Sequence, residues 1–175
     1  MNATCLVPSA GHAGSVSHAR DGATCVVRLA GDLRHTQGPA FDRFIDGLLA
    51  DAGIDRVIVD LSEAVGIDST MLGLLARLAL GLDERDGRKP LLVSPRADIN
   101  TLLDSICLDD CFLRCDAAVA PTGTALAEAR AESVGETEAA RVILDAHRTL
   151  ARMNGANRAA FSCVVEALER ELRER

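Results

Sequence analysis

Hydrophobic and polar positions alternate near the beginning of the chain and follow helical spacing farther on. Two strand-like runs flank Asp21-Gly22, a dipeptide typical of a tight hairpin turn. In the second run, residues 24–29, apolar side chains alternate with other residues, as in a strand with one buried face. From residue 38 to residue 52 the apolar positions recur at helical spacing, which predicts an amphipathic helix.

The middle of the chain alternates between short strands and longer helices. Residues 56–61 and 90–93 are short apolar runs typical of buried strands. Residues 71–82, which lie between them, are almost continuously apolar over a length that suits a buried helix. A third helix is predicted over residues 98–107, with Asp98 as its cap.

The order of these elements predicts an α/β fold. Strands joined through helices become parallel neighbours, and the opening hairpin makes the sheet mixed. With a last strand over residues 111–114, we expect four to five strands packed with α-helices. The chain then divides into a flexible leader (1–14), a domain (15–116), a linker (117–135) and a C-terminal extension (136–175).

The C-terminal extension is predicted to be a helical hairpin. Residues 137–153 and 156–173 each carry an apolar stripe, and Asn154-Gly155 separates them. Such a hairpin is marginal alone, because ordering each residue costs about 1–2 kcal/mol. It must dock on its own domain, on a second copy of the chain or on a partner. We favour a homodimer through these helices, or the partner, since the domain is complete by about Asp116.

Composition disfavours several classes of function. The chain has 4 Phe, no Trp or Tyr and a net charge of −7, so we expect no direct contact with nucleic acid. No apolar run reaches the ~20 residues that span a bilayer, and residues 1–14 do not resemble a signal peptide. These features predict a cytoplasmic protein without membrane insertion, in which the 6 Cys stay reduced.

Motifs for catalysis or metal binding are few. We find no Ser–His–Asp order, phosphate-binding glycine loop or metal quartet, so we expect neither enzymatic activity nor a cofactor. Cys107, Cys111 and Cys115 have a spacing that a helix would align for a metal, but Asp109-Asp110 interrupts the run. We interpret these cysteines as core or surface thiols. His147, beside the apolar stripe of its helix, is interpreted as a residue at the edge of an interface.

Three stretches resemble the STAS domain, the family of sulfate transporters and anti-sigma-factor antagonists. They are residues 26–33, residues 57–73 and residues 108–112, and the resemblance covers about residues 15–116. Asp68-Ser69-Thr70, before a helix that contains small residues, is the most specific part, because it resembles the family's phosphorylation motif. The C-terminal extension lies outside the resemblance.

The resemblance implies a phosphorylation-controlled switch between partners. In phosphorylatable members, the unmodified domain binds an anti-sigma factor, often a serine/threonine kinase, and so frees the sigma factor. The kinase phosphorylates the serine, the complex separates, and a PP2C-type phosphatase resets the switch. Ser69 is the acceptor that the motif implies, with Thr70 as the alternative. The implied partner-binding residues are Asp32, Arg34, Asp68 and Met71.

The chemistry of Ser69 agrees with this interpretation. At the start of a helix its hydroxyl can cap the first turn, whose free N–H groups can also hold a phosphate. Phosphorylation adds about −1.5 to −2 charges, which makes an acidic patch with Asp68 and Asp32 that a partner must desolvate. Arg34 stands where many regulatory members are acidic, and it can pair with the phosphate or change kinase recognition. Met71 is expected to be an apolar contact at this surface.

Three other interpretations stay open at this point. Asp68-Ser69-Thr70 can be a helix cap and nothing more. The domain can be a constitutive scaffold, such as the STAS subunit of a lipid-transport ATPase complex, which needs no phosphorylation. It can also sense a small ligand or a nucleotide, with the C-terminal extension as its output.

Overall fold

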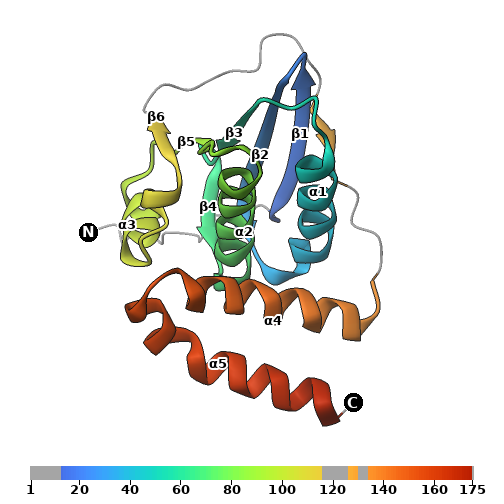
Figure 1. Ribbon diagram of the computed structural model, residues 1–175, viewed down its shortest axis with the longest axis vertical. Coiled ribbons are helices and arrows are strands. Elements are labelled where there is room, and N and C mark those ends of the chain that lie inside the picture. Colours follow the sequence, from blue (N-terminus) through green and yellow to red (C-terminus); the bar gives the residue numbers. More distant parts are fainter. Residues whose placement is uncertain (1–12, 116–125, 130–133, 175) are drawn as a thin grey trace, which may run out of the picture.

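A mixed β-sheet with helices packed against one of its faces forms the centre of the protein (Figure 1). The structure is a computed structural model that describes residues 13–115, 126–129 and 134–174. Most of the predicted leader and of the predicted linker lies outside these residues. The architecture confirms the α/β fold that the order of the elements predicts. No helix in the described ranges has the length and apolar character needed to cross a membrane.

The sheet begins with the predicted hairpin. β1 (Ser15–Asp21) and β2 (Thr24–Leu33) are antiparallel, and Gly22 in the turn has a φ of 56°, a value that favours glycine. Parallel pairing then extends the sheet from β2 through β3 (Arg56–Asp60), β5 (Leu91–Val93) and β6 (Leu113–Cys115).

The sequence pattern does not predict two further short strands. β4 (Ala64–Ile67) pairs in parallel with the end of β2, where the register shifts between Gly31 and Asp32. β7 (Ala127–Glu128) lies in the predicted linker and pairs with β1. β2 continues beyond the predicted run of residues 24–29 to Leu33, and from Gly31 onward its parallel neighbour is β4 instead of β3.

The helices of the domain agree with the periodicity except at their ends. α1 (Gly38–Ala50) and α2 (Ser69–Asp86) pack on the sheet, and α3 (Ala97–Ser105) lies near β4 (Figure 1). The prediction that Asp98 caps α3 is wrong, because Arg96 occupies the N-cap position. The carboxylate of Asp98 instead accepts hydrogen bonds from the Arg96 guanidinium, at 2.6 and 3.1 Å.

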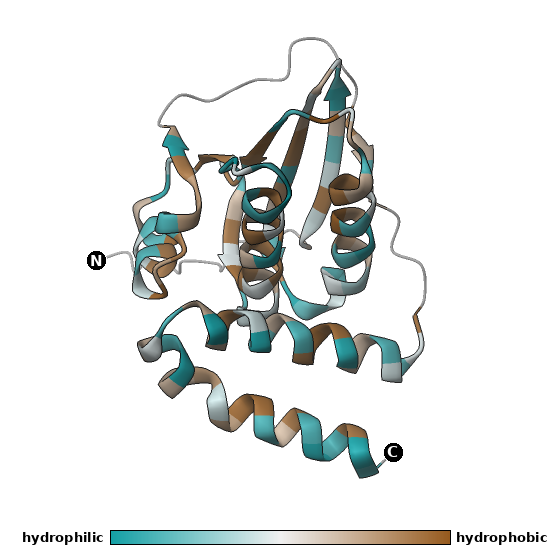
Figure 2. Ribbon diagram, in the orientation of Figure 1, coloured by the Kyte–Doolittle hydropathy of each residue, from teal (hydrophilic) through white to brown (hydrophobic). Residues whose placement is uncertain are grey.

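The main core lies between the sheet and helices α1 and α2. Figure 2 shows hydrophobic residues along the strands and an alternation of hydrophobic and hydrophilic residues around the helices. Large side chains from both layers are fully buried, among them Leu29, Leu33, Phe41, Ile45, Leu74, Leu75 and Leu78. Burying each side chain of this size contributes roughly 1.5–3 kcal/mol. A core dominated by aliphatic residues therefore holds the layers together.

The C-terminal extension is a helical hairpin, as predicted. α4 (Glu136–Met153) and α5 (Gly155–Glu174) meet at Asn154. The side-chain oxygen of Asn154 accepts a hydrogen bond from the backbone N–H of Asn157 at 2.8 Å and so caps the start of α5.

The hairpin docks on its own domain, so our expectation of a second copy or a partner is wrong for α4. This helix crosses beneath α1 and α2 in Figure 1, and Val142, Ala146 and Leu150 belong to the same buried cluster as the domain core. Gly73 of α2 makes the close crossing possible, because a Cβ atom there would overlap the backbone of Ala146. The apolar stripe of α4 is thereby removed from water without a second chain.

Candidate functional site

Ser69 is the first residue of α2, and only Asp68 separates it from the end of β4. The helix is capped by Asp68, whose carboxylate accepts hydrogen bonds from the backbone N–H groups of Met71 at 3.0 Å and His35 at 2.6 Å. The prediction that the Ser69 hydroxyl caps the helix is therefore wrong, because Asp68 has the extended backbone of an N-cap residue and Ser69 is already helical. The Ser69 hydroxyl is left to bond outside its own helix.

The Ser69 hydroxyl bonds to a histidine from the C-terminal extension. Its Oγ lies 2.9 Å from Nε2 of His147 on α4. Nδ1 of the same ring lies 2.8 Å from the carbonyl oxygen of Ile143, which can only accept. In the neutral ring Nδ1 is therefore the donor and Nε2 the acceptor, so the Ser69 hydroxyl donates to His147. Sequence reasoning placed His147 at an interface edge but did not connect it with Ser69.

His147 is held in place from the side opposite the domain. Its side chain is 5% exposed, and the ring of Phe161 on α5 meets it edge-on with 6.0 Å between ring centroids. A bonded Nδ1, a bonded Nε2 and an aromatic neighbour together fix the orientation of the imidazole. Both helices of the extension thus contribute to the surroundings of Ser69.

Thr70, the alternative acceptor, is far less accessible than Ser69. It is 3% exposed, and its methyl group faces Gly38 at the start of α1, 3.5 Å from where a Cβ of that glycine would lie. Val142 of α4 lies at the same 3.5 Å from that point. Thr70 is thus enclosed near the junction of α1, α2 and α4, whereas Ser69 is partly exposed.

Asp32 and Arg34 form an exposed ion pair near the end of β2. The Asp32 carboxylate accepts from Nε of Arg34 at 2.9 Å, and a second guanidinium nitrogen lies at 2.8 Å. Gly66 of β4 leaves room for this carboxylate, because a Cβ there would lie 2.7 Å from Oδ1 of Asp32. Arg34, which the sequence analysis considers as a partner for the phosphate, is thus neutralised by Asp32 in this structure.

Met71 is not a surface contact. It is 0% exposed and shares the inner side of α2 with Leu74, Leu75 and Leu78, at the spacing of one helix face. Our expectation for Met71 is therefore wrong, because the register of α2 turns this position toward the core. The exposed apolar residue near the site is Val65 on β4, 54% exposed, which the sequence pattern missed together with its strand.

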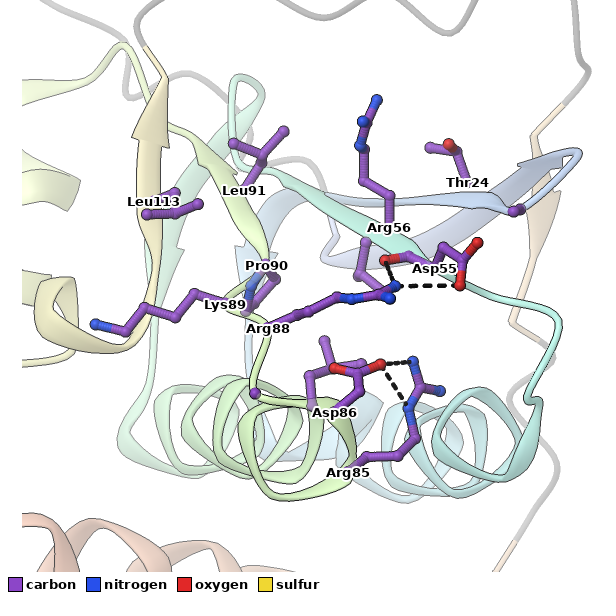
Figure 3. Close-up of a pocket in the computed structure, with 14 residues that line it drawn as sticks. Thr24, Asp55, Arg56, Arg85, Asp86, Arg88, Lys89, Pro90, Leu91 and Leu113 are labelled. Carbon is purple, nitrogen blue, oxygen red and sulfur yellow. Dashed lines mark hydrogen bonds and ion pairs between the residues drawn. The ribbon is translucent and has the colours of Figure 1, made fainter.

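A pocket of about 770 Å³ lies at the other end of α2 (Figure 3). Arg85 and Arg88 line it, but both are engaged, Arg85 with Asp86 at 2.8 Å and Arg88 with Asp55 at 3.1 Å. The hydrogen bond from Arg85 lowers the pKa of the Asp86 carboxyl. Arg85 also donates to the backbone carbonyl oxygens of Leu48, Asp51 and Ile54, and so joins the end of α2 to the end of α1 and the segment that follows it.

The spaced cysteines lie in different structural surroundings. Cys107 is exposed, Cys111 ends a short 3₁₀ turn and Cys115 ends β6. Burial raises the pKa of the Cys111 thiol, which keeps it protonated and so disfavours metal binding. In the part of the chain that the structure describes, no three His, Cys, Asp or Glu side chains gather where they could hold a metal ion.

Comparison with known proteins identifies the domain. The family model described as "Mlab, STAS domain" matches residues 16–113. No curated protein sequence matches the chain.

Solved structures show the same fold at low sequence identity. The anti-sigma factor antagonist SpoIIAA in its unphosphorylated form is 19% identical with a TM-score of 0.50, over 59% of this chain and 88% of SpoIIAA. The NMR structure of TM1081 is 18% identical with a TM-score of 0.52, over 67% of this chain and 91% of TM1081. The phosphorylated form of SpoIIAA, a Bacillus cell fate determinant, has 19% identity and a TM-score of 0.49, over 58% and 91% of the two chains.

Proposed function

Because the chain belongs to the STAS-domain family, we propose that it is an anti-sigma-factor antagonist whose partner binding is switched off by phosphorylation of Ser69. The unphosphorylated form binds an anti-sigma factor that is also a serine/threonine kinase and so releases the sigma factor. A PP2C-type phosphatase restores the unphosphorylated form. The protein itself needs no catalytic activity or cofactor for this role, and we expect it in the cytoplasm, where sigma factors act.

The observation that carries the proposal is that Asp68, and not Ser69, caps α2. Asp68 caps α2, so the hydroxyl of Ser69 is not required to hold the helix. The free N–H groups and the positive end of an 18-residue helix favour a phosphate at this position. The alternative acceptor Thr70 is 3% exposed and enclosed by two other helices, which further supports Ser69.

Added charge explains how phosphate would separate the complex. Phosphorylation adds about −1.5 to −2 charges next to the Asp68 carboxylate, whereas the charge of Asp32 is already paired with Arg34. A partner that accepts a neutral hydroxyl would have to desolvate this anionic patch. A loss of about 3 kcal/mol weakens binding more than a hundredfold.

The test is phosphorylation by a candidate kinase encoded beside the gene, with ATP and mass mapping of the product. We expect phosphate on Ser69, none on Ser69→Ala, and unchanged partner binding by Ser69→Ala. Thr70→Val is the matched control, because it removes the neighbouring hydroxyl and should still be phosphorylated. Phosphate found mainly on a residue other than Ser69 or Thr70 would disprove the proposal.

A second candidate function is a constitutive STAS subunit of a lipid-transport ATPase complex. The observation that favours it is the hydrogen bond between Ser69 and His147, which covers the acceptor in the absence of any partner. For this function, the tagged protein would co-purify with an ATPase and a permease. Ser69→Asp would then leave the complex intact, whereas it should weaken binding to an anti-sigma factor.

A further inference from the structure

The C-terminal hairpin of the same chain covers the hydroxyl of Ser69. The hydroxyl donates to Nε2 of His147 at 2.9 Å, and His147 is 5% exposed. We propose that α4 and α5 are an autoinhibitory cover, which must leave Ser69 before a kinase or an anti-sigma factor can reach it. The inference rests on the proposed function of Ser69, and it gives a regulatory role to helices that lie outside the family match.

A kinase cannot act on Ser69 while the cover is closed. In phosphoryl transfer, Oγ bonds to the γ-phosphorus as the bond to ADP breaks, and the hydroxyl proton passes to a base of the kinase. In the structure the Ser69 hydroxyl instead directs this proton into a hydrogen bond to His147. One turn farther along α2, the backbone of α4 at Ala146 lies against Gly73. α4 therefore covers both the Ser69 hydroxyl and the first turn of α2.

The cover is held firmly in α4 and loosely in α5. Val142 and Leu150 of α4 are part of the core cluster. In the described part of α5, Asn157 is the only buried residue, and its side chain donates to the carbonyl oxygen of Ile106 at 2.9 Å. Phe161, which supports His147, is only partly buried. Segments with few buried contacts open at low free energy, so we expect opening to begin in α5.

A phosphate on Ser69 does not fit under the closed cover. The 2.9 Å between Oγ and Nε2 leaves no room for a phosphorus atom and three oxygens. Phosphorylation would therefore hold the cover open, and removal of the phosphate would let it close.

A reversible disulfide provides the test with the full chain. A Cβ on Gly38 would lie 3.5 Å from Cγ1 of Val142, so the side chains of cysteines at these two positions would lie close together. The double variant Gly38→Cys/Val142→Cys ties α4 to α1 without altering Ser69, and Val142→Cys alone is its control. The exposed Cys107 and Cys163 are replaced by Ser in both, to prevent other pairings.

Two quantities are measured: phosphorylation of Ser69 by the candidate kinase encoded beside the gene, and binding of that kinase. We expect the oxidised double variant to lose at least about tenfold in both, and dithiothreitol to restore them. Equal rates before and after reduction would show that the cover does not regulate Ser69, while the proposed function stands. If neither the oxidised nor the reduced protein binds the kinase or is phosphorylated, the proposed function fails, and the autoinhibition with it.

A loosened cover gives the opposite test without a disulfide. Asn157→Ala/Phe161→Ala weakens the attachment of α5 at two points away from Ser69, so it should raise the rate of phosphorylation several-fold. Val164→Ala on the same helix is the control, because Val164 is 39% exposed. Hydrogen exchange should show faster opening of residues 136–174 in the double variant, with β2 and β3 still protected. An unchanged phosphorylation rate in a variant with that faster opening would contradict the inference.

Discussion

Gly73 of α2 and Ala146 of α4 lie so close that a side chain on Gly73 would overlap the backbone of Ala146. This contact sets the separation of the two helices, and it places His147, the next residue, against Ser69 one turn earlier on α2. The close approach of α4 therefore requires a glycine at this position, although alanine has the higher helix propensity and would stabilise α2 alone.

Gly73→Ala should force α4 away from α2. The neighbour is backbone and cannot rotate aside, so we expect a loss of about 1–3 kcal/mol in the free energy of unfolding. At roughly 2–4 °C per kcal/mol for a chain of this size, thermal denaturation measures the loss directly. The control is Gly47→Ala in α1, where no described atom outside the adjoining turns of the helix lies within 4 Å of the new Cβ, and helix propensity should keep or raise the stability. Equal melting temperatures for the two variants would contradict the close crossing.

Met71→Lys should destabilise the whole domain. Met71 is 0% exposed in the core, so lysine would bury an unpaired charge at a cost of about 3 kcal/mol or more. Met71→Leu, which nearly conserves volume, should cost less than about 1.5 kcal/mol. Urea denaturation followed by circular dichroism distinguishes them. A well-folded Met71→Lys variant that loses only partner binding would contradict the burial of Met71 and support a position at the binding surface.

Removal of residues 136–175 should lower the melting temperature of the domain. Val142, Ala146 and Leu150 leave the core with this deletion, and the apolar surface beneath α4 becomes exposed to water. Removal of residues 155–175 alone should cost less, because Asn157 is the only buried residue in the described part of α5. Light scattering on each protein checks the association state. A parent oligomer that falls to a stable monomer on deletion would show docking between copies instead.

Cys25 should make stability fall at alkaline pH. Burial raises the pKa of its thiol from 9.0 to about 11, with Arg20 opposing the shift. Between these two values the unfolded chain loses the proton that the folded protein keeps, so the free energy of unfolding decreases as pH rises from about 9 to about 11. Denaturation at a series of pH values, compared with Cys25→Ala, isolates this contribution. A decline of equal size in the variant would assign it to other groups.

Local patterns in the sequence determined most of the elements. Alternation before and after Asp21-Gly22 predicts the hairpin of β1 and β2, and 3.6-residue spacing predicts α1, α4 and α5. The Asp68-Ser69-Thr70 motif marks the start of α2. These features depend on residues that are near one another in the chain, so composition and spacing are sufficient to predict them.

Tertiary structure alone decided which surfaces meet. β4 and β7 are short and owe their existence to pairing with β2 and β1, strands far away in the sequence, so no local pattern signals them. The burial of Met71 depends on the rotation of α2 about its axis, which packing sets. Ser69 and His147 are 78 positions apart, and they meet only because Gly73 allows two helix backbones to touch. Contacts of this kind depend on the shape of both surfaces, which the hydrophobic pattern of either segment does not specify.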